Sequence, residues 1–85
     1  MNQTRVTATD EYFRSADLCL VTLISLTFPI EAIDRTLSPK AYFLFKRSDE
    51  LDELIQLFWR GECHIEPQRF FAQLKSIKAR LYGDA

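Results

Sequence analysis

The sequence predicts an α+β domain in which one helix is followed by a β-hairpin and then by two helices packed on the hairpin. Two segments, 51–58 and 70–81, carry apolar side chains three and four residues apart, which is the spacing of one face of an α-helix. Residues 41–46 are rich in aromatic side chains and alternate with a period of two, as a half-buried strand does. These patterns predict a mixed fold whose helices and strands share one core.

The composition is that of one folded domain. Of the 85 residues, 47% are hydrophobic and 27% are charged, which is ordinary for a globular protein and too apolar for a disordered chain. We expect residues 1–11 to form a flexible N-terminus and residues 12–85 to form a single domain. Eleven basic and twelve acidic residues give a net charge of −1, which argues against a strongly basic nucleic-acid binder.

Residues 18–26 are predicted to form the first helix. Ser15 is the expected N-cap, with Asp17 in the first turn, and Pro29 ends the helix. The segment is apolar nearly all round, so other parts of a protein must cover it nearly all round. Such a helix is either the central element of the domain or part of an interface between copies, and on this ground we expect a homodimer.

Residues 30–47 are predicted to form the hairpin, with Pro39 in its turn. Alternation in the second arm places Phe43 and Phe45 on one face, which core packing explains, and Tyr42 on the other. Tyr42 is therefore the candidate for a solvent-facing ring of the kind on which RNA bases stack. The strand lacks the glycines of such an RNA-binding motif.

The second helix is expected to begin after Ser48, whose hydroxyl is a cap and which acidic residues follow. It is expected to end before Gly61, which would adopt a left-handed backbone conformation. Its apolar stripe consists of Leu51, Leu54, Ile55 and Phe58. Residues 63–66 are an extended connector and a candidate third strand.

The third helix is expected to begin at Pro67, whose fixed backbone angle suits the first helical position, and to run to about Tyr82. Its core stripe consists of Phe70, Leu74, Ile77 and Leu81.

Three local patterns occur together in this order: YFRSADL at residues 12–18, YFLF with SDEL over residues 42–51, and LFWRG at residues 57–61. Their order and spacing resemble the DUF5659 domain family, a group of small bacterial and phage-associated proteins. The resemblance extends over residues 12–82. It implies a fold consistent with the one predicted here, and it implies no established activity and no catalytic residue.

The residues that carry chemistry do not converge in the sequence. Cys63 and His64 are neighbours on an extended segment, so their side chains point to opposite faces, with Cys63 expected to be buried and His64 exposed. Cys19 and Cys63 are expected to be free, mostly buried thiols. The acidic residues after Ser48 are expected to be a solvated start of a helix. We therefore expect no catalytic residue, no metal site, no cofactor and no small-molecule substrate.

The third helix carries a second stripe beside its core stripe. Phe71, Lys75, Lys78 and Tyr82 recur at i, i+4, i+7 and i+11, and we expect them to form a contact surface. Two lysines between two aromatic rings suit phosphates or an acidic partner helix. The other reading of the stripe is that Phe71 widens the core face and the lysines only solvate the helix.

On these grounds the chain is expected to be a small non-catalytic binding or accessory module that acts through contact with another protein. The alternative is a nucleic-acid-binding accessory protein of a phage or mobile element. The apolar run of residues 18–28 is too short to span a bilayer and follows acidic residues, whereas a secretory signal carries positive charge there. We therefore expect a cytoplasmic protein with no membrane partner.

Overall fold

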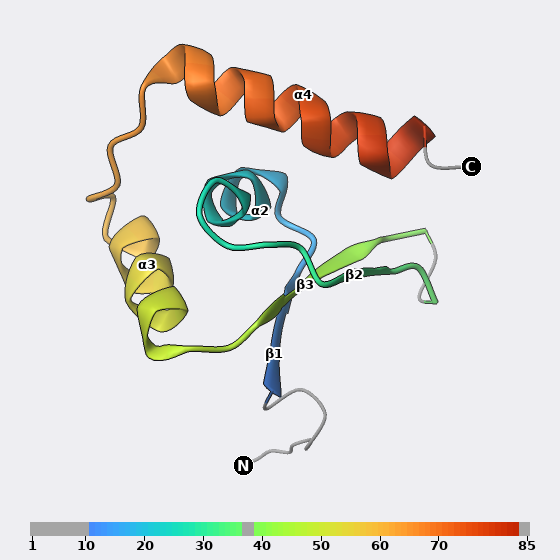
Figure 1. Cartoon of the computed structure of the whole chain (residues 1–85), viewed down its shortest axis with the longest axis horizontal. Coiled ribbons are helices and arrows are strands. Elements are labelled where there is room, and N and C mark those ends of the chain that lie inside the picture. The colour runs from blue at the N-terminus through green and yellow to red at the C-terminus, as the bar shows by residue number, and fades with distance from the viewer. Residues whose placement is uncertain (1–10, 37–38, 84–85) are drawn as a thin grey trace.

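A computed structural model describes residues 11–36 and 39–83. The elements in chain order are β1 (Tyr12–Ser15), α2 (Leu18–Ser25), β2 (Ala32–Asp34), β3 (Tyr42–Lys46), α3 (Asp49–Trp59) and α4 (Pro67–Gly83). This arrangement confirms the predicted α+β class (Figure 1). The expected flexible N-terminus, apart from Glu11, and residues 37–38 of the expected turn lie outside the described residues.

The three strands form one antiparallel sheet in the order β1-β3-β2. The predicted hairpin is present as β2 and β3, in which Ile33 lies opposite Phe43. Strand β1 was not predicted, and it pairs with the other edge of β3, with Phe13 opposite Phe45. Four residues carry too little alternation to mark a strand, so the pairing with β3 decides the conformation of this segment.

The cap of α2 differs from the prediction. Ser15 is the last residue of β1 and not the N-cap, and its hydroxyl oxygen accepts a hydrogen bond from the N–H of Asp17 at 3.0 Å. Asp17 is the N-cap, because its carboxylate accepts from the N–H groups of Cys19 at 3.0 Å and Leu20 at 3.3 Å. The helix ends at Ser25, four residues before Pro29.

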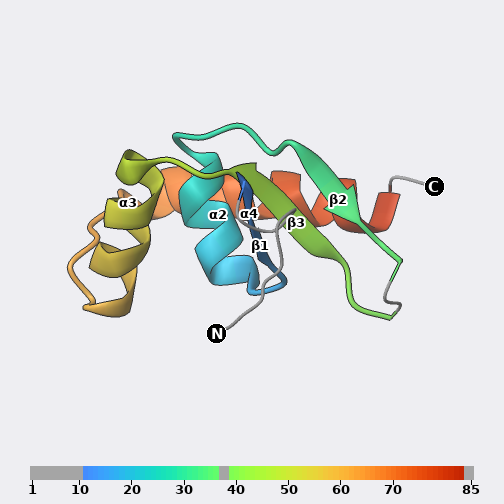
Figure 2. The ribbon, with the colours of Figure 1, turned by 90° about the horizontal axis from the view of Figure 1, so that it is seen from below.

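Helix α2 is the central element of the fold. It lies between the sheet and α4, with α3 beside it (Figures 1 and 2). The core consists of fully buried side chains from α2, β3, α3 and α4, namely Leu20, Val21, Ile24, Phe43, Phe45, Leu51 and Ile77. Helices α3 and α4 pack chiefly against α2. One copy of the chain therefore covers the apolar run of α2, so the reason given for a dimer through this helix does not hold, while self-association itself stays a prediction.

The boundaries of α3 follow the predicted signals. The hydroxyl oxygen of Ser48 accepts from the N–H of Leu51 at 3.1 Å, and Gly61 has a φ of 70° just after the helix. The stripe that includes Leu51 and Phe58 packs against the core, as predicted.

Residues 63–66 form no strand, in contrast to the candidate strand named above. Pro67 is the first residue of α4, as predicted. The carboxylate of Glu66 caps this helix by accepting from the N–H groups of Gln68 at 3.1 Å and Arg69 at 2.8 Å.

A cross-strand cluster lies on the sheet face opposite the core. The Arg14 guanidinium lies 4.6 Å from the centroid of the Tyr42 ring and pairs with the Asp34 carboxylate at 3.2 Å. Tyr42 is therefore half-buried, and Arg14 occupies one side of the ring that was expected to face solvent. The pKa of Asp34 is held below its ordinary value, first by hydrogen bonds from the hydroxyl and N–H of Thr36, at 2.6 and 2.9 Å, and then by the Arg14 charge.

The pKa of Asp34 is expected to rise toward its ordinary value in the Thr36→Val variant, because the hydroxyl donor is lost. A carboxyl whose pKa is lower in the folded state stabilises the fold above its unfolded pKa, and this stability is lost as the pH falls through the folded value. An NMR titration of the Asp34 carboxyl measures the change. Arg14→Gln is expected to raise the pKa by less, and a larger rise in that variant would contradict the assignment.

Leu51 is the one fully buried side chain of α3. The Leu51→Ala variant is expected to lower the free energy of unfolding by about 2–5 kcal/mol, because it leaves a cavity in the core. Glu53→Ala, on the exposed side of the same helix, is expected to change it by less than about 0.5 kcal/mol. Urea denaturation measures both values, and equal losses in the two variants would show that the buried face of α3 is assigned incorrectly.

Candidate contact surface

The predicted stripe of α4 lies at the surface of the protein. Phe71 is 59% exposed and Tyr82 is 75% exposed, and Lys75 and Lys78 are exposed between them. The reading in which Phe71 widens the core face does not match this exposure. The predicted core stripe of the same helix packs inward, with Ile77 fully buried and Leu81 against the core.

The stripe has its own internal contact. The Lys75 ammonium nitrogen lies 5.7 Å from the centroid of the Phe71 ring, within the range of a cation–π interaction. Ion pairs elsewhere in the protein join Arg14 to Asp34, Arg47 to Asp52 and Arg60 to Glu62. Within the part of the chain that the structure describes, neither Lys75 nor Lys78 has a carboxylate partner.

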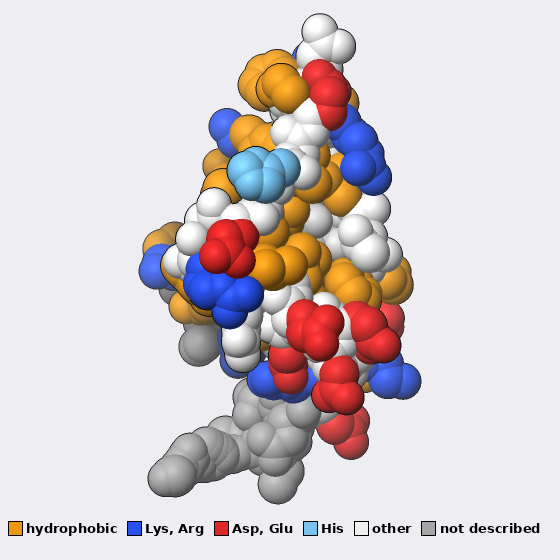
Figure 3. Space-filling model, turned by 90° about the vertical axis from the view of Figure 1, so that its left-hand side faces the viewer, with side chains coloured by type: hydrophobic (Ala, Val, Ile, Leu, Met, Phe, Trp, Pro, Cys, Tyr) orange, Lys and Arg blue, Asp and Glu red, His pale blue; other side chains and the backbone are white. Residues whose placement is uncertain are grey.

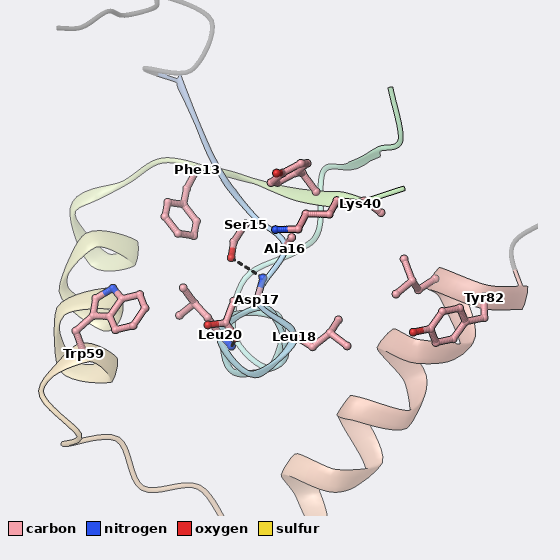
Figure 4. Close-up of a pocket in the computed structure, with 12 residues that line it drawn as sticks. Phe13, Ser15, Ala16, Asp17, Leu18, Leu20, Lys40, Trp59 and Tyr82 are labelled. Atoms are coloured by element: carbon pink, nitrogen blue, oxygen red, sulfur yellow. Dashed lines mark hydrogen bonds between the residues drawn. The ribbon is translucent and has the colours of Figure 1, made fainter. Parts of the chain in front are cut away.

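A hollow of about 630 Å³ adjoins the Tyr82 end of α4. Figure 4 shows Trp59 and Tyr82 on opposite sides of it, with the first turn of α2 and Leu18 between them. Lys40, two residues before β3, extends into the same hollow. Trp59 is 66% exposed, so it contributes a large apolar ring to this surface.

A second hollow, of about 530 Å³, adjoins the Phe71 end of α4. It is mostly apolar and lies between the first turns of α2, the end of α3 and the start of α4, with the lining Cys19, Leu23, Phe58, Cys63, Ile65, Pro67, Phe70 and Phe71. Both cysteines line it as free thiols. The expectation of buried thiols was wrong, because Cys19 is exposed and Cys63 is only half-buried. His64 is exposed, as predicted.

Both hollows border the first turn of α2, because Leu18 lines one and Cys19 lines the other. Three exposed aromatic side chains, Trp59, Phe71 and Tyr82, border them. We call this surface the aromatic face, made of Leu18, Cys19, Lys40, Trp59, Phe71, Lys75, Lys78 and Tyr82. The helical spacing of the sequence indicated which side chains of α4 share this side, and they are exposed as that interpretation requires. Trp59 was not predicted to join them, since nothing local indicates that α3 and α4 flank the same end of α2.

The aromatic face carries positive charge. Asp17 is the acidic residue in the lining of the first hollow, and its carboxylate already accepts two backbone N–H groups as the cap of α2. The acidic residues of the first turn of α3 lie at the end of that helix opposite Trp59, and Figure 3 shows acidic side chains gathered toward one end of the side that it draws. An anionic group would therefore be attracted to the lysines of the aromatic face.

The described residues contain neither a cluster suited to a metal ion nor a helix suited to a membrane span. No group of three or more His, Cys, Asp or Glu side chains is placed to hold a metal ion in this part of the chain. Among the described helices, none has both the length and the apolar character needed to cross a membrane.

Comparison with known proteins identifies one family. A model described as a domain of unknown function, DUF5659, matches residues 10–83. No curated protein and no solved structure matches the chain. The match covers all six described elements and carries no information on activity.

The two thiols are expected to differ in reactivity toward Ellman's reagent under native conditions. Cys19 lies exposed on the first turn of α2 and is expected to react about as fast as a free thiol, whereas the half-buried Cys63 reacts several-fold more slowly. The absorbance of the released thiolate measures both phases. Cys19→Ser is expected to remove only the fast phase, and a single phase for both thiols in the parent protein would contradict the exposures described here.

Proposed function

The chain belongs to the DUF5659 family, and from its surface we propose that it is a small non-catalytic module that acts through contact with another protein. The observation that carries the proposal is the aromatic face, on which Trp59, Phe71 and Tyr82 stand exposed around two hollows. Aromatic side chains are enriched at the centres of protein interfaces because they bury a large area with few rotatable bonds.

The shape of this surface also favours a macromolecular partner. Small monomeric proteins seldom expose a contiguous apolar patch unless it is used, since such a patch promotes association. Hollows beside exposed rings give a partner both pockets to fill and rings to cover. We propose a non-catalytic role because the charged groups of this surface are lysines and Asp17. The Asp17 carboxylate is already engaged as the cap of α2 by the N–H groups of Cys19 and Leu20.

The alternative proposal is a nucleic-acid-binding accessory protein of a phage or mobile element. It is favoured by the lysines beside the rings, because phosphates bind lysine and bases stack on aromatic side chains. For either partner we propose a cytoplasmic location, because both cysteines are free thiols and the cytoplasm keeps thiols reduced.

Site-specific photo-cross-linking tests the proposed function. A photoreactive amino acid at position 82, in cells that express the chain, is expected to yield a discrete protein adduct, because Tyr82 is at the edge of the first hollow. The same group at Lys46, exposed on the sheet, is the control and is expected to yield none. Denaturing gels and mass spectrometry identify the product.

The adduct from position 82 is expected to disappear when Phe71→Ser is added, since that change alters the surface and not the core. An adduct that nuclease removes would favour the alternative function. Adducts of equal yield from positions 82 and 46 would contradict a specific contact through the aromatic face.

A further inference from the structure

We propose that the aromatic face binds an acidic amphipathic helix of another protein, which lies lengthwise along α4. This inference rests on the proposed function and names the class of partner. It is carried by the spacing of the α4 stripe, by its lysines, which have no carboxylate partner in the part of the chain that the structure describes, and by the position of Trp59 across the end of α2.

The spacing of the stripe fits a helix as its partner. Phe71 and Tyr82 are eleven residues apart, which is about 16 Å along the axis at a rise of 1.5 Å per residue. The intervals of four, three and four residues between Phe71, Lys75, Lys78 and Tyr82 are those by which one helix packs lengthwise along another. A partner helix of about three turns would reach both aromatic rings at once.

The charges of the stripe indicate the chemistry of that helix. Lys75 and Lys78 lie between the two rings and have no carboxylate partner among the described residues. Lys40 adds a third cation at the edge of the first hollow. Carboxylates near the middle of a bound helix would pair with these ammonium groups, while apolar side chains at its ends would contact Phe71 and Tyr82.

The far wall of the binding surface is provided by Trp59. Figure 4 shows its ring across the first turn of α2 from Tyr82, with Leu18 between them. A helix seated along α4 would approach Leu18 and Cys19 and remove water from the Trp59 ring. Trp59 is the only tryptophan of the chain, so its fluorescence reports occupation of this surface directly.

A second copy of this chain fits the surface less well. Contact between the aromatic faces of two copies would bring together the lysines of both, and like charges in one interface oppose association. The acidic first turn of α3 is at the opposite end of that helix from Trp59, so it is not placed to compensate those charges in such a dimer.

Titration of the full chain with synthetic peptides tests the inference. The probe is an amphipathic helical peptide of about 15 residues with leucines toward both ends of one face and glutamates between them on that face, since isolated helices much shorter than this are not stable. The matched peptide carries lysines in place of the glutamates. The acidic peptide is expected to shift the Trp59 emission to shorter wavelength with saturation, and to bind at least about tenfold more tightly than the basic peptide.

Charge reversal on the two flanks of α4 supplies the variants. The Lys75→Glu, Lys78→Glu double variant is expected to weaken binding of the acidic peptide at least about tenfold and to favour the basic peptide. The control is Arg69→Glu, Arg80→Glu, which changes the net charge equally on the opposite flank and is expected to alter binding by less than about threefold. Thermal unfolding monitored by circular dichroism establishes that both variants are folded.

Equal binding of the two peptides, no shift of Trp59 emission by the acidic peptide, or equal losses in the two double variants would overturn the inference. A shift produced by a 15-nucleotide oligothymidine and not by the acidic peptide would also overturn it. A protein cross-link from position 82 combined with failure of the acidic peptide to bind would contradict the acidic helix alone and leave the proposed function standing.

Discussion

The burial of α2 is the constraint on which the rest of this structure depends. The middle of the helix is apolar on almost every side, so it is stable in water only when it is surrounded. Aromatic side chains of β3 cover one side, Leu51 of α3 covers another, and Ile77 of α4 covers a third. The sheet and the two later helices are therefore positioned by their common contact with α2.

This coverage ends at the first turn of α2, and the aromatic face occupies the site where it ends. Cys19 is exposed there and Leu18 is half-buried, whereas the residues from Leu20 to Ile24 are buried. Helices α3 and α4 pass this end on two sides and leave rings of Trp59 and Tyr82 beside it. The same helix thus organises both the core and the surface that we propose as the contact site.

The local arrangement of charge matters more for this protein than its net charge of −1. Acidic residues gather at the start of α3, where they interact favourably with the helix dipole. The lysines of α4 lie on a different surface, beside aromatic rings and without described carboxylate partners. A nearly neutral chain therefore presents a surface whose exposed charges are positive, which is the charge that the proposed acidic partner requires.

The sequence by itself determined the features that depend on neighbouring residues. Ser48 and Gly61 mark the ends of α3 because caps act within one turn, and the spacing from Phe71 to Tyr82 placed both rings on one side of α4 because helical geometry is local. The tertiary structure alone decided which elements meet. Strand β1 exists through its pairing with β3, some thirty residues away along the chain, and that pairing displaced the α2 cap from Ser15 to Asp17. The packing of α3 and α4 around α2 also placed Trp59 at the aromatic face and left Cys19 exposed. Neither position depends on a local sequence pattern.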